Sequence, residues 1–127
     1  VSHVMDIMAT CVDLGGAGYP KRRNGADILP PEGRSLVPAF SGKPDVPRTL
    51  IFEHEHNAAI RQGDWKLVSE NGLGKTGMRP GAVWRLHDLA NDPCEQHDLA
   101  KEQPERVKEM AGTFLSEAHR TLVLPAP

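Results

Sequence analysis

Two histidines that stand two residues apart are the first side chains here whose types and spacing could do chemistry. They belong to the run Glu53-His54-Glu55-His56. In a regular strand, residues two apart share one face and lie roughly 6.6 Å apart. The alternation therefore predicts a strand that continues through His56. Both imidazoles would lie on the face of Leu50 and Phe52, close enough to bind one metal ion.

A metal site of this kind needs at least one further ligand. The nearest candidates in sequence are His87, Asp88, His97 and Asp98. The alternative is that the two histidines simply form the polar end of a strand. A small histidine-based metal-binding protein is therefore one alternative function.

Arg61 is a third candidate, because it alternates with Ile60 on the next expected strand. Its planar guanidinium could bind an anion through two parallel hydrogen bonds. It could equally pair with a neighbouring carboxylate on the sheet. The sequence has no Gly-x-Ser-x-Gly, His-Glu-x-x-His, dinucleotide or complete phosphate-loop motif. These residues alone give no complete catalytic set.

The elements that must position these residues form an α+β arrangement, with a small antiparallel sheet of about four strands and a C-terminal helix. Strands are expected at 49–56, 58–62, 65–69 and 82–87, and Gly63-Asp64 predicts a two-residue type II′ hairpin. Pro104 suits the first position of a helix that ends near residue 121. Its apolar stripe could cover one face of the sheet and consists of Val107, Met110, Ala111, Phe114 and Ala118.

The first half of the chain predicts a helix and a long irregular connection. Residues 3–14 have helical apolar spacing, with Ser2 as the expected cap. Residues 15–48 are rich in proline and glycine, with one short helical turn expected at 35–40. The charged run Lys21-Arg22-Arg23 is expected to be a solvated loop. Cys11 and Cys94 form no CxxC pair, so two buried structural thiols are expected.

The composition limits the function classes. The chain has 127 residues, of which 25% are charged and 39% hydrophobic, as in soluble globular proteins. The net charge of −2 gives no basic field for nucleic acid and no polybasic membrane anchor. No stretch approaches the ~18 apolar residues that a transmembrane helix needs. Nucleic acid and membrane are therefore not expected as partners.

Four segments of the chain carry recognisable motifs in a fixed order. They read HVMDIMATCVDLGG from His3, EGRSLVPAFSGK from Glu32, FEHEHNAAIRQGDWKLV from Phe52 and WRLHDLANDPCEQHDLA from Trp84. Together they resemble the C-terminal part of sulfatases of the arylsulfatase type, over nearly the whole chain. His56 stands where the resembled motif commonly has glycine.

The resemblance implies that the chain is a C-terminal fragment, and the start at Val1 without an initiator methionine favours the same interpretation. Residues 1–46 would be the tail of a large α/β, alkaline-phosphatase-like domain, and residues 47–127 a sheet-and-helix subdomain. The parent would hydrolyse sulfate esters and use a formylglycine and a divalent cation, calcium or magnesium. Formylglycine is made in a C/S-x-P-x-R motif, and neither Cys11 nor Cys94 lies in one.

No catalytic residue, metal ligand or cofactor is therefore expected in this chain, which is predicted to be inactive alone. Its expected partners are the upstream catalytic half of the same protein and a sulfated small molecule or glycan. The resemblance implies that the first strand and its turn border the substrate pocket. His54 is the first candidate to contact the leaving group or sulfate, and His56, Asn57 and Arg61 are further substrate-binding candidates. A free-standing binding module that uses the sheet face or edge is the other alternative.

Overall fold

The computed structural model describes residues 1–44 and 46–125. The chain divides into two compact units, Val1–Val46 and Pro47–Pro127. Each unit has its own secondary structure. No helix in the described ranges is long and apolar enough to cross a membrane.

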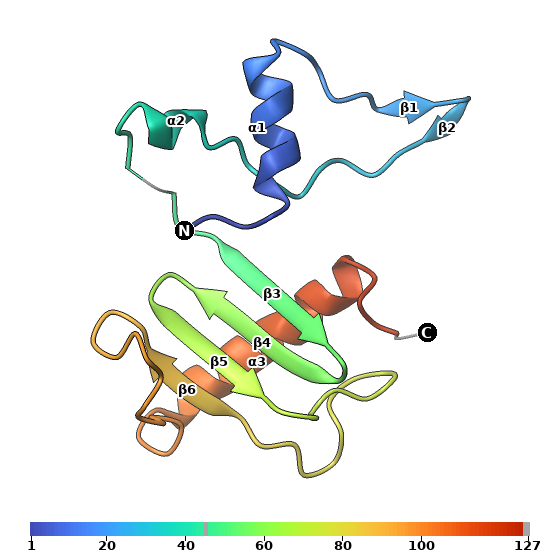
Figure 1. Ribbon diagram of the computed structural model, residues 1–127. Coiled ribbons are helices and arrows are strands. Elements are labelled where there is room, and N and C mark those ends of the chain that lie inside the picture. Colours follow the sequence, from blue (N-terminus) through green and yellow to red (C-terminus); the bar gives the residue numbers. More distant parts are fainter. Residues whose placement is uncertain (45, 126–127) are drawn as a thin grey trace. The chain divides into compact units, whose positions relative to one another are not determined.

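The second unit contains a four-stranded antiparallel sheet and one long helix (Figure 1). The strands are β3 (Thr49–His54), β4 (Asn57–Gln62), β5 (Trp65–Ser69) and β6 (Arg85–Asp88), and they lie side by side in chain order. The helix α3 (Pro104–Arg120) packs against one face of this sheet. The predicted α+β fold is confirmed, although β6 begins three residues later than the strand expected at 82–87.

The hydrophobic core lies between α3 and the sheet. The strand register aligns Ile60, Leu67 and Leu86, all fully buried, across the middle of the sheet. The predicted helical stripe faces them, with Phe114 fully buried and its ring packed edge-on to Trp84 at 5.8 Å between centroids. Burial of this apolar surface is the main source of stability for such a unit.

The sequence pattern predicts the hairpin between β4 and β5 but not the hairpin between β3 and β4. Gln62 pairs with Trp65 across Gly63 and Asp64, and Gly63 has a φ of 60°, which confirms the predicted two-residue hairpin. The strand expected through His56 is wrong, because β3 ends at His54. Glu55 and His56 form a second two-residue turn, with φ of 49° and 71°.

The first unit is held together by polar contacts of its helix. The helix α1 (Asp6–Leu14) begins after Met5, so the expected cap by Ser2 is wrong. The buried Asp6 carboxylate accepts hydrogen bonds from the backbone N–H groups of His3 (2.7 Å) and Arg34 (2.9 Å). Thr10 Oγ1 donates to the Asp6 carbonyl at 2.7 Å and accepts from a backbone N–H of the connecting segment. These bonds join α1 to that segment.

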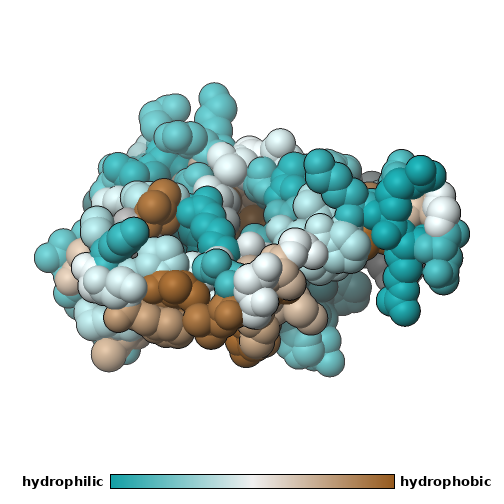
Figure 2. Space-filling view, turned by 90° about the horizontal axis from the view of Figure 1, so that it is seen from above, coloured by the Kyte–Doolittle hydropathy of each residue, from teal (hydrophilic) through white to brown (hydrophobic). Residues whose placement is uncertain are grey.

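The apolar side chains of α1 are exposed instead. The exposed group comprises Val4 just before the helix and Ile7, Met8 and Leu14 within it. The surface view in Figure 2 also shows hydrophobic residues, in brown, at the surface beside hydrophilic ones. The helix α1 therefore presents its polar side to its own unit and an apolar side outward.

Three local expectations for the chain need correction or refinement. The charged run at 21–23 forms part of a small hairpin of β1 (Arg22–Arg23) and β2 (Ala26–Asp27), so it is not simply a loop. The helical turn expected at 35–40 is the shorter α2 (Val37–Phe40). Cys11 and Cys94 are both exposed free thiols, so the expectation that they are buried is wrong.

Candidate functional site

The face of the sheet opposite α3 brings most of the candidate residues together. Side chains alternate along each strand, so the residues next to the core residues in sequence project to this opposite face. In register, His54 lies opposite Asn57, Leu50 opposite Arg61, and Arg61 opposite Lys66. Three of the four predicted substrate-binding residues, His54, Asn57 and Arg61, thus share one face.

Asn57 fixes the corner of the sheet that carries His54. Its Nδ2 donates to the His54 carbonyl at 2.8 Å, and its Oδ1 accepts from the Asn71 backbone N–H at 3.0 Å. The His54 side chain is 85% exposed, and its Nε2 lies 4.0 Å from Glu55. The imidazole therefore stands in solvent on a backbone that the Asn57 amide holds in place.

A pocket of about 330 Å³ opens at this corner. Its lining includes Phe52, His54 and Asn57 from the first hairpin, and Val68 and Glu95 from farther along the chain. An imidazole at its rim can donate or accept a proton. We call this cavity the His54 pocket.

His56 lies apart from this arrangement, which corrects the predicted pair on one strand face. Its positive φ takes it out of the strand, and its backbone N–H donates to Glu53 Oε1 at 3.2 Å. His54 and His56 therefore do not form the pair of metal ligands that a regular strand would place on one face. Over the part of the chain that the structure describes, no three histidine, cysteine or acidic side chains gather as a metal site.

The residues suggested as a third ligand have other partners. His87 is buried, and its Nδ1 lies 2.9 Å from the His97 carbonyl oxygen. Asp98 Oδ1 accepts from the backbone N–H groups of Leu86 (3.0 Å) and Ala100 (2.9 Å). These side chains thus join the segment after β6 to the edge of the sheet.

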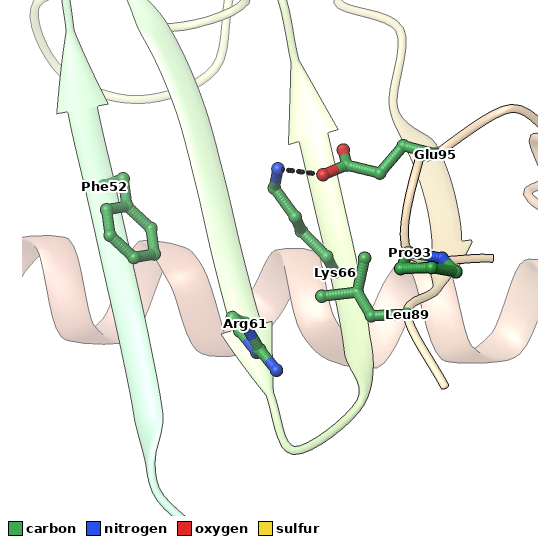
Figure 3. Close-up of a pocket in the computed structure, with 6 residues that line it drawn as sticks. All are labelled: Phe52, Arg61, Lys66, Leu89, Pro93 and Glu95. Atoms are coloured by element: carbon green, nitrogen blue, oxygen red, sulfur yellow. Dashed lines mark hydrogen bonds and ion pairs between the residues drawn. The ribbon is translucent and has the colours of Figure 1, made fainter. Parts of the chain in front are cut away.

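Arg61 belongs to a second pocket on the same face, of about 350 Å³ (Figure 3). It lies four residues beyond Asn57 on β4, or ~13 Å at ~3.3 Å per residue. Six residues from four segments line this Arg61 pocket: Phe52, Arg61, Lys66, Leu89, Pro93 and Glu95. Arg61 is therefore separate from the His54 pocket, and Phe52 and Glu95 line both.

Lys66 and Glu95 are site residues that the sequence reasoning missed. Lys66 Nζ lies 2.5 Å from Glu95 Oε1, and both side chains are partly buried. Their places in the motifs GDWKL and NDPCE were the available signal, since each motif belongs to the family resemblance. This ion pair fixes the loop after β6 over the sheet.

Two carboxylates stabilise the loop that carries Glu95. Hydrogen bonds from the backbone of His97 and Gln96 hold the pKa of Asp92 below its ordinary value. Desolvation by burial raises the pKa of Asp98, but hydrogen bonds from the backbone of Leu86 and Ala100, together with nearby positive charge, outweigh it, and the net shift is downward. Both carboxylates are therefore most stabilising when charged.

The residues of this chain do not fit the cofactors that the family resemblance implies. Cys11 and Cys94 lie outside any C/S-x-P-x-R motif, so neither can supply a formylglycine. The described residues also offer no three-ligand group for a divalent cation.

Comparisons with known proteins give a consistent result. No protein-family model matches the chain. The chain is 31% identical, over 128 residues, to an uncharacterized sulfatase of Schizosaccharomyces pombe. That alignment covers 98% of the chain but only 22% of the relative, so the chain spans about a fifth of the protein it matches.

Solved structures share the fold. One, from work on glycosaminoglycan metabolism by Bacteroides thetaiotaomicron, matches with a TM-score of 0.61 at 24% identity over 87% of this chain and 24% of that chain. A structure described as a 2-O GAG sulfatase matches with a TM-score of 0.61 at 20% identity over 91% of this chain and 24% of its own. The sequence match and the shared fold together support a relation of this chain to the sulfatase family, in its C-terminal region.

Proposed function

We propose that the chain is the C-terminal part of an enzyme that hydrolyses sulfate esters, and that it completes the fold and borders the substrate pocket. The match along nearly the whole chain to about a fifth of a sulfatase carries this proposal. The remaining length of such a protein supplies the formylglycine and the cation site that this chain does not fit. The chain alone is then inactive.

The outward apolar side of α1 supports this proposal. Val4 is 72% exposed and Ile7 is 60% exposed, while the polar Asp6 and Thr10 are buried. Apolar side chains at helical spacing normally pack against another element. A larger catalytic domain of the same protein is the partner that would cover them.

The His54 pocket supports a role at the substrate. The His54 imidazole is exposed at the end of β3, where Asn57 holds the backbone by hydrogen bonds at both ends of its amide. In the proposed role, His54 donates a proton or a hydrogen bond to the oxygen that leaves the sulfate. Asn57 orients the backbone that carries His54.

The test uses the whole protein encoded by the reading frame that contains this chain. Hydrolysis of an aryl sulfate and of a sulfated sugar is measured for the whole protein, its His54→Ala variant and its His119→Ala variant. His119 is an exposed histidine on α3 and serves as the matched control. His54→Ala should lower kcat/KM by roughly 10²-fold or more, and His119→Ala should leave it unchanged.

Three outcomes would contradict the proposal. Sulfatase activity of the 127-residue chain well above that of its own His54→Ala variant would show that the chain is catalytic alone. A reading frame without an upstream C/S-x-P-x-R motif would favour the free-standing binding module. Equal activity of the His54→Ala and His119→Ala variants would show that His54 does not act on the substrate.

A further inference from the structure

Arg61 has hydrogen-bond donors that the described residues leave unused. Its Nε donates to the Gly63 carbonyl at 2.9 Å, which orients the guanidinium beside the hairpin. An arginine on a sheet commonly pairs with a carboxylate on the neighbouring strand. The residue opposite Arg61 on β5 is instead another cation, Lys66.

The charge of Lys66 is already balanced, whereas that of Arg61 is not. Glu95 pairs with Lys66 at 2.5 Å, and this pair lies at the side of the pocket (Figure 3). Among the described residues, no carboxylate forms an ion pair with Arg61. The Arg61 pocket therefore keeps about one net positive charge, with the terminal guanidinium nitrogens available to a ligand.

The rest of the pocket is apolar. Phe52, Leu89 and Pro93 line it together with Arg61 and the ion pair, and the Phe52 side chain is 39% exposed. A ligand that fits this pocket has a ring whose C–H groups contact the apolar residues and an anionic substituent that binds the guanidinium. Sugars that carry a sulfate or a carboxylate have this chemistry.

We propose that the Arg61 pocket binds a sulfate or carboxylate group on a sugar residue other than the one that is cleaved. This inference rests on the proposed function, in which the cleaved sulfate lies at the His54 pocket. Arg61 lies ~13 Å beyond Asn57 along β4, so one substrate that reaches both residues must be larger than a single sugar. Phe52, which lines both pockets, lies between the two bound groups.

The experiment is a titration of the ¹⁵N-labelled 127-residue chain followed by NMR. The Arg61 Nε–H signal reports on the Arg61 pocket, and the Asn57 side-chain amide signal reports on the His54 pocket. The probes are glucose 6-sulfate, glucuronic acid, neutral glucose and inorganic sulfate. Variants Arg61→Gln, Arg61→Lys and Lys108→Gln are titrated in parallel, because Lys108 is an exposed cation on α3.

At least one anionic sugar should shift the Arg61 signal in a saturable way, and glucose should not. Loss of a charged hydrogen-bonding group should weaken binding roughly tenfold or more in Arg61→Gln. Arg61→Lys should fall between the wild type and Arg61→Gln, and Lys108→Gln should match the wild type. Saturation by glucose 6-sulfate alone assigns the site to sulfate, and by glucuronic acid alone to carboxylate.

An Arg61 signal that no sugar shifts, while the Asn57 signal moves, would overturn this inference and leave the proposed function intact. Equal affinity for inorganic sulfate and glucose 6-sulfate would also overturn it, because the apolar wall would then contribute nothing. Saturable sugar binding at Arg61 in a protein whose whole form hydrolyses no sulfate ester would instead contradict the proposed function.

Discussion

Replacing His56 with glycine should stabilise the second unit. His56 has a φ of 71° in the two-residue turn between β3 and β4. That left-handed conformation crowds the Cβ of any residue except glycine. The described contacts of His56 are made by its backbone, since its N–H donates to Glu53 and its carbonyl accepts from Leu73. Glycine can keep both.

The expected gain follows from two opposing terms. Relief of the left-handed conformation is worth ~1–2 kcal/mol. The greater freedom of glycine in the unfolded chain costs about 0.5–1 kcal/mol. With the middle of each range, the net expectation is that His56→Gly raises the free energy of unfolding by about 0.75 kcal/mol. The resembled sulfatase motif, which commonly has glycine here, fits this expectation.

Urea denaturation followed by tryptophan fluorescence measures this change. Both tryptophans, Trp65 and Trp84, lie in the second unit, so their fluorescence reports on the unit that contains the turn. With a slope of ~1 kcal/mol/M, the midpoint should rise by about 0.75 M. The control is His54→Gly at the end of β3, which should lower the midpoint because glycine weakens a strand. A lower midpoint for His56→Gly would refute the reasoning.

Three other stability predictions follow from the same unit. Asp98→Asn should destabilise the chain at neutral pH. Because folding lowers the pKa of Asp98, its stabilisation is present above the ordinary value of 3.8 and is lost as pH falls through the lower folded value; urea midpoints at several pH values should therefore converge in acid. Gly112→Ala in α3 should add about 1 kcal/mol, since its Cβ would meet nothing within 4 Å. Gly72→Ala should lose about 1–3 kcal/mol, because its Cβ would lie 2.0 Å from Ser69 Oγ; a stable Gly72→Ala protein or an unstable Gly112→Ala protein would contradict these contacts.

The parts of the fold that sequence predicts are those with local signals. A proline at the start and an apolar stripe mark α3, and Gly63 at the first turn position marks the second hairpin. The first hairpin lacks such a signal, because Glu55-His56 is not one of the Asn-Gly, Asp-Gly or Gly-Gly pairs that mark two-residue turns with positive φ. Polar alternation simply continues through this turn, so the pattern predicts a longer strand than the one present.

The candidate site depends on that same turn. Once β3 ends at His54, register places His54 opposite Asn57 and takes His56 off the sheet face. The sequence groups Arg61 with these residues. Arg61 lies four residues beyond Asn57 on β4, however, and lines a second pocket. The pairing of Lys66 with Glu95 joins residues 29 positions apart, and such a contact follows from topology, which periodicity cannot supply.

The orientation of α1 bears on how substitutions in this chain are interpreted. The buried hydrophobic residues of the core all lie between Leu50 and Leu124, so the exposed Ile7 and Met8 add little to the stability of the isolated chain. Under the proposed function, the same side chains lie in an interface of the whole protein. Folding free energy and evolutionary fitness are then different quantities at these two positions, and a substitution that is neutral for the first can be harmful for the second.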